Sequence, residues 1–130
     1  MYRLEWDKLD FLECLEVAPI FQEDNFSYAY DVLRNEFRLL VVVLSESDAI
    51  RFTLRHEQCE TPMIAFVLFV RGKIAKINDK RSEFLIFPDS VFAPDEEWHS
   101  EATELMKLRR LALGLTLELQ IKPNITFRFS

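Results

Sequence analysis

Three neighbouring runs decide the fold of this chain: Phe37-Arg38-Leu39-Leu40-Val41-Val42-Val43-Leu44, Ala49-Ile50-Arg51-Phe52-Thr53-Leu54-Arg55 and Met63-Ile64-Ala65-Phe66-Val67-Leu68-Phe69-Val70. The first and third runs are short and rich in β-branched and aromatic residues, which favours strands over helices. Because successive side chains of a strand point to opposite faces, a strand that is apolar throughout must be covered on both faces. These runs therefore predict the middle of an antiparallel sheet with something packed on each side.

The middle run alternates between apolar and polar residues. Ile50, Phe52 and Leu54 fall on one face, and the opposite face is polar, which predicts that it meets water or a partner. If the hairpin register allows, four arginines share this second face and form either a solvated surface or an anion site. These residues are Arg34, Arg38, Arg51 and Arg55.

Shorter runs supply the remaining strands, separated by turns built from Asn, Asp, Ser and Pro. Pro88 stops one of these runs, so residues 88–94 are predicted to form a loop. The segment Ile74–Ile77 either continues the preceding strand past a bulge at Gly72 or begins a new strand. The other predicted strands are Phe26–Val32, Phe84–Phe87, Leu115–Ile121 and Ile125–Phe129.

Two helices are also expected. The first spans Trp6–Val17, where Asp7 is a good N-cap and Trp6 is placed to pack on Phe11 as a hydrophobic staple. The second, longer helix begins at Asp95 and ends near Gly114, and its apolar residues keep helical spacing. These apolar residues are Trp98, Ala102, Leu105, Leu108, Leu111, Ala112 and Leu115.

Together these elements predict a single α+β domain over residues 1–130. We expect an antiparallel meander sheet of about five to seven strands, with the N-terminal helix and the longer C-terminal helix packed on it. The fallback is a β-sandwich or partial barrel, in which the late strands close over the sheet.

Composition limits the function. The hydrophobic share of 49% excludes a disordered tail, and the net charge of −6 argues against a nucleic-acid-binding surface. No run reaches the ~20 apolar residues of a membrane span, and the N-terminal residues lack the pattern of a signal peptide. We therefore expect a soluble cytoplasmic protein with no nucleic-acid or membrane partner.

The chain offers few groups for catalysis or cofactor binding. The chain has only two glycines, Gly72 and Gly114, so it cannot form a glycine-rich phosphate-binding loop. Cys14 is predicted to be a buried thiol and Cys59 an exposed one. The cluster His56, Glu57, Cys59 and Glu60 contains three kinds of metal ligand but lacks a second ligand pair. No metal, cofactor or catalytic residue is predicted, and the chain is not expected to be an enzyme.

The densest acidic patch lies at the start of the predicted C-terminal helix. It is either a solvated surface that matches the helix dipole or a binding surface for a basic partner. The candidate partner-binding residues are Asp95, Glu96, Glu97, Glu101 and Glu104.

The leading hypothesis is a small acidic interaction module. It is either an inhibitor or immunity-type protein that neutralises a basic protein partner, or a domain that forms a homodimer through an uncovered sheet face or edge. The alternative is a small-molecule-binding domain with a pocket between the sheet and the C-terminal helix. Such a pocket would be lined by Tyr28, Tyr30 and Trp98.

Overall fold

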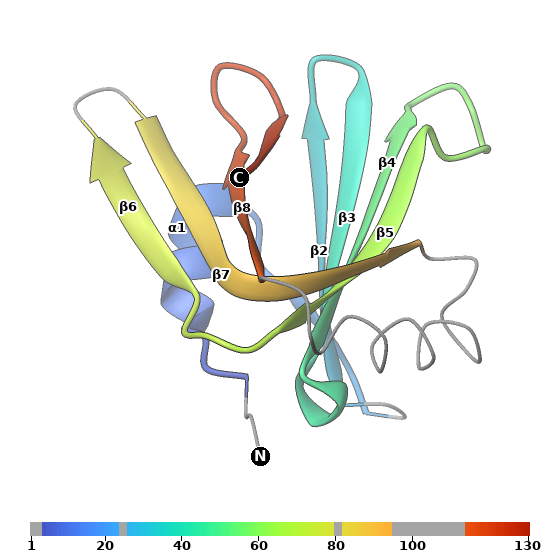
Figure 1. The fold of residues 1–130 in the computed structure, drawn as a ribbon. Helices are drawn as coiled ribbons and strands as arrows, with labels where there is room; N and C mark the ends of the chain where they lie inside the picture. Colours follow the sequence, from blue (N-terminus) through green and yellow to red (C-terminus); the bar gives the residue numbers. More distant parts are fainter. Residues whose placement is uncertain (1–3, 24–25, 80–81, 95–113) are drawn as a thin grey trace.

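The computed structural model describes residues 4–23, 26–79, 82–94 and 114–130. These residues form one antiparallel sheet of nine strands with a single short α-helix and one 3₁₀ turn (Figure 1). In chain order the elements are α1 (Lys8–Leu15), β1 (Ile20–Gln22), β2 (Ser27–Arg34), β3 (Phe37–Leu44), η1 (Ser45–Ser47), β4 (Ala49–His56), β5 (Ile64–Val70), β6 (Ala75–Asp79), β7 (Ser82–Pro94), β8 (Leu115–Gln120) and β9 (Thr126–Phe129).

The predicted antiparallel sheet is confirmed. Strands β1 to β5 pair consecutively, and the sheet continues through β7, β8 and β9, while β6 pairs with β7. Val41 of β3 lies opposite Phe52 of β4, which in turn lies opposite Phe66 of β5. The two predicted faces of β4 are confirmed. Its apolar residues lie on one face and its polar residues on the other.

The predicted α+β class with two helices is wrong. The described chain is 60% strand and 11% helical, and its one α-helix is short. The longer C-terminal helix was expected over residues 95–113, which lie outside the described residues, and Leu115 begins β8 rather than ending a helix. None of the helices described is both long enough and apolar enough to cross a membrane.

The N-terminal helix follows its sequence signals closely. The side chain of Asp7 accepts a hydrogen bond from Leu9 N at 2.8 Å, and Glu16 ends the helix in the left-handed conformation. The rings of Trp6 and Phe11 meet edge to face with centroids 5.1 Å apart, which is the predicted staple contact.

Strand β7 is where the prediction of a loop over residues 88–94 fails. The strand runs through Pro88 and bends, so that its first half pairs with β6 and β8 and its second half pairs with β5 (Figure 1). The register shifts between Phe87 and Ser90, and Asp89 has a φ of 48°. This bulge accommodates a proline, which has no N–H for the ladder, without ending the strand.

Both glycines of the chain lie against this corner. A Cβ atom on Gly72 would come 2.8 Å from Pro88 Cγ. A Cβ atom on Gly114 would overlap the Asp89 carboxylate and lie 3.0 Å from Asp89 Cα. Arg71 binds the same carboxylate at 2.8 Å, which leaves Asp89 little freedom to move away. The bend therefore needs glycine at both positions that lie against the corner, Gly72 and Gly114, because neither position has room for a side chain.

The main core lies on the concave face of the bent sheet. Helix α1 covers part of it, because Phe11 packs between Tyr30 of β2 and Phe87 of β7 with centroids 5.4 and 6.1 Å away. Strand β9 covers another part, since Phe127 contacts the rings of Phe52 and Phe66. Helix α1 and the last strand of the sheet, β9, thereby cover the concave face.

Replacement of Gly72 or Gly114 by alanine should destabilise the fold by about 1–3 kcal/mol, because a methyl group must force the β7 corner open. Urea unfolding measures the loss. Gln58→Ala, at an exposed position in the β4–β5 turn, is the control and should change the free energy of unfolding by less than about 0.5 kcal/mol. If the two glycine variants were as stable as Gln58→Ala, the claim that the β7 corner needs these glycines would be contradicted.

Candidate partner-binding surface

The convex face of the sheet has an apolar cluster of its own. Leu44, Ala49 and Val67 are buried there, with Val42 and Phe69 partly buried beside them. On the same strands, the alternate residues, whose side chains point the other way, form the main core on the concave face. The prediction that the central strands are covered on both faces holds for the concave face, whereas on the convex face Val42 and Phe69 stay partly exposed among the described residues.

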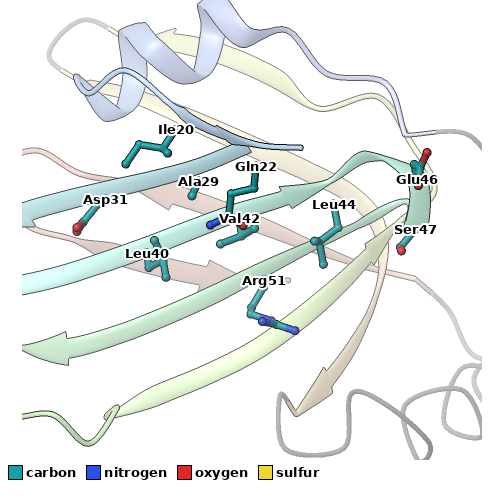
Figure 2. A pocket seen from close by; sticks show the side chains of 10 residues that line it. All are labelled: Ile20, Gln22, Ala29, Asp31, Leu40, Val42, Leu44, Glu46, Ser47 and Arg51. Carbon is teal, nitrogen blue, oxygen red and sulfur yellow. The ribbon is translucent and has the colours of Figure 1, made fainter. Parts of the chain in front are cut away.

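A hollow of about 670 Å³ lies next to this cluster, over strands β1 to β4 (Figure 2). Its floor is apolar and comes mainly from β2 and β3, and its rim is polar. The lining residues are Ile20, Gln22, Ala29, Asp31, Leu40, Val42, Leu44, Glu46, Ser47 and Arg51.

Small side chains in β2 explain why the surface is hollow. Ala29 lies between Ile20 of β1 and Val42 of β3 in the strand register. Its methyl group leaves a depression between these larger side chains, and Leu40 and Leu44 continue the floor along β3. Leu40 and Val42 remain half exposed at positions where a solvated sheet face would ordinarily carry polar residues.

The charges of the hollow are separated along its length. Figure 2 shows Asp31 at one end and Glu46 with Ser47 at the other, with the apolar floor between them. Both carboxylates are exposed. Arg51 is half buried and takes part in an interaction within the protein.

A second, smaller hollow of about 130 Å³ adjoins the first and is lined by Asp31, Arg38, Leu40, Thr53 and Arg55. Arg38 binds Asp31 at 2.8 Å, and Arg55 donates to the carbonyl oxygens of Glu57 and Cys59. Of the four arginines predicted to share a face, three do so.

Arg34 is the exception among these arginines. It pairs with Phe37 and belongs to the other side of β2, where its Nε atom reaches the Pro123 carbonyl at 3.5 Å. Each arginine that lines a hollow has an interaction within the protein, and the buried Nε atom of Arg38 has no hydrogen-bond partner among the described residues. The predicted anion site stays a prediction.

The sequence-predicted acidic patch, Asp95, Glu96, Glu97, Glu101 and Glu104, lies outside the described residues, as does Trp98. The predicted partner-binding role of these residues stays a prediction. Tyr28 and Tyr30 are described, but their rings pack on Trp6 and Phe11 rather than lining either hollow. The geometry therefore gives the predicted small-molecule pocket no support.

The cluster at His56 does not assemble a metal site. Among the residues that the structure describes, no group of three or more potential ligands converges. His56 Nε2 lies 3.6 Å from Glu36, and His56 Nδ1 accepts a hydrogen bond from Gln58 N. The histidine thus joins the β2–β3 and β4–β5 turns.

The two cysteines behave as predicted, with Cys14 buried and Cys59 exposed. Burial, and then the nearby carboxylates of Glu83, Asp10 and Glu16, raise the pKa of the Cys14 thiol to about 12. Burial also raises the pKa of Tyr30 to about 12. Both groups are therefore neutral parts of the core at physiological pH.

Sequence reasoning found the part of the floor that β3 contributes, but not the parts of the hollow that β1 and β2 contribute. The apolar outward positions Leu40 and Val42 were visible as a strand without alternation. Ile20 and Ala29 gave no such signal, because only the pairing of β1 with β2 places them beside β3.

Comparison with known proteins gives one finding about the fold. No protein-family model matches the chain, and a search of curated protein sequences found no match. A solved structure described as a contact-dependent growth inhibition toxin–immunity protein complex from Klebsiella pneumoniae 342 contains a similar chain, with a TM-score of 0.68 and 17% sequence identity. The alignment covers 100% of this chain and 98% of that chain. The similarity extends over the whole fold, and it does not support the predicted homodimer.

Stability should fall as the pH rises from about 9 to 12. The unfolded chain releases the Cys14 and Tyr30 protons near pH 9.0 and 10.0, whereas the folded protein holds them until about pH 12. Each group then costs up to about 1.4 kcal/mol per pH unit. Cys14→Ala should flatten the slope between pH 9 and 10 in urea unfolding, and Cys59→Ser should leave it unchanged. Equal slopes in both variants would contradict a buried Cys14.

Tyr30→Phe should keep or raise the stability of the protein. The Tyr30 hydroxyl is buried and has no hydrogen-bond partner among the described residues. Its removal relieves an unsatisfied polar group, a gain of up to about 1–3 kcal/mol in urea unfolding. A loss of more than about 1 kcal/mol would show that the hydroxyl is satisfied in the folded protein.

Proposed function

We propose that this chain is an immunity-type protein that binds and neutralises a protein toxin. The observation that carries the proposal is the similarity of the entire fold to a chain from a toxin–immunity protein complex. Both chains are covered almost completely, so the similarity concerns the complete architecture rather than one common motif.

Charge supports the immunity role rather than the toxin role. The described residues contain ten Lys and Arg against sixteen Asp and Glu, so the described part of the chain carries the whole net charge of −6. An acidic protein attracts a basic partner, and electrostatic attraction speeds association. Rapid capture is what a protein that neutralises a toxin requires.

The hollow on the convex face of the sheet is a surface suited to binding a protein. The hollow offers an apolar floor with exposed carboxylates at its ends. Protein interfaces combine an apolar centre with a polar rim in the same way.

A growth assay tests the proposal. The product of a neighbouring gene, tested as the toxin, is expressed from an inducible promoter in a host that lacks both genes. The toxin and the chain are each expressed alone and then both together. We expect growth arrest with the toxin alone and normal growth with both proteins. Calorimetry on the purified pair should show a 1:1 complex.

The control is Phe52→Asp, which puts a carboxylate into the buried core and should prevent folding. This variant should not protect. Growth arrest caused by the chain alone would identify it as the toxin member of the pair. Arrest that persists in the presence of the wild-type chain, or protection by Phe52→Asp, would also overturn the proposal.

A further inference from the structure

We infer that the hollow over β1 to β4 is the surface that receives the toxin, and that its occupant is an apolar segment with a lysine or arginine at the end that faces Glu46. This inference rests on the proposed function and adds the place and the chemistry of binding.

The first reason is that the concave face of the sheet is already occupied. Phe11 of α1 and Phe127 of β9 fill it, and the central aromatic residues Tyr30, Phe52 and Phe87 are fully buried there. The convex face instead keeps a half-exposed apolar floor in the hollow. An apolar depression of this kind gains free energy when a partner excludes water from it.

The second reason is the shape of the depression. Leu40 to Leu44 spans about 13 Å at ~3.3 Å per residue, so the floor suits a segment of roughly two helical turns or four extended residues. Ala29 provides the depth, and Ile20, which is 64% exposed, forms the wall at the sheet edge. A side chain of the partner can enter beside Ala29 and contact Val42.

The third reason is charge complementarity. The exposed carboxylates of Asp31 and Glu46 lie at opposite ends of the apolar floor (Figure 2). Arg38 already pairs with Asp31, which fixes that carboxylate in place and leaves it partly open to solvent. Arg51, the cation of the hollow, is engaged within the protein. Glu46 is therefore the exposed carboxylate that suits a cation on the partner segment, because Arg38 already matches the charge of Asp31.

The test measures the affinity of the toxin domain for three variants of the hollow. Val42→Arg places a cation on the floor, Ala29→Met fills the depression, and Glu46→Lys reverses one end charge. We expect the first two to weaken binding by at least about a hundredfold and the third by about tenfold. Binding of the wild-type chain should weaken with added salt, and Glu46→Lys should reduce this salt dependence.

Matched controls carry the same changes elsewhere on the surface. Ile77→Arg in β6, Ala18→Met after α1 and Glu60→Lys in the β4–β5 turn all lie at exposed positions outside the hollow. Each should bind within about twofold of the wild type. Thermal unfolding confirms that every variant is folded before its affinity is interpreted, and a hollow variant that does not fold is replaced by Val42→Lys or Ala29→Leu.

The outcomes separate this inference from the proposed function. If the wild-type chain protects cells and the folded hollow variants bind as tightly as the controls, the inference is overturned and the immunity role stands. If the wild-type chain binds no toxin, the proposed function fails first. Dimers of the wild-type chain that Val42→Arg dissociates in sedimentation, without toxin present, would assign the hollow to a second copy and overturn the inference.

Discussion

The bend in β7 is the constraint on which the rest of the structure depends. One strand belongs to two parts of the sheet, because it pairs with β6 and β8 before the bend and with β5 after it. The bulge at Pro88 and Asp89 makes the bend possible, and Gly72 and Gly114 leave room for it. Without the bend, β9 would remain four strands away from β4 and could not cover its aromatic residues.

Closure of the concave face determines which apolar surface of the sheet stays accessible. Phe11 and Phe127 occupy that face, so the described chain builds its main core without help from another protein. The convex face carries a smaller apolar cluster and, beside it, a hollow with carboxylates at its ends. The described chain thus presents a partly apolar surface with exposed carboxylates on its convex face.

Short-range signals predicted much of the fold. The alternation of β4, the apolar runs of β3 and β5 and the capping of α1 by Asp7 all agree with the structure, because each depends on neighbours within a few residues. The strand after Pro88 was missed because a proline ordinarily ends a strand, and only the partner strands β5 and β8 show that the chain continues through a bulge.

The sequence by itself determined that the central strands are apolar on both faces and that the chain is acidic. Tertiary structure decided which face forms the core and which presents the hollow, since the sequence treats Val41 and Val42 alike. It also decided that Ala29 lies between Ile20 and Val42, a contact created by two strand pairings. The physical reason is that periodicity describes one strand, whereas a surface is made of side chains that several strands bring together.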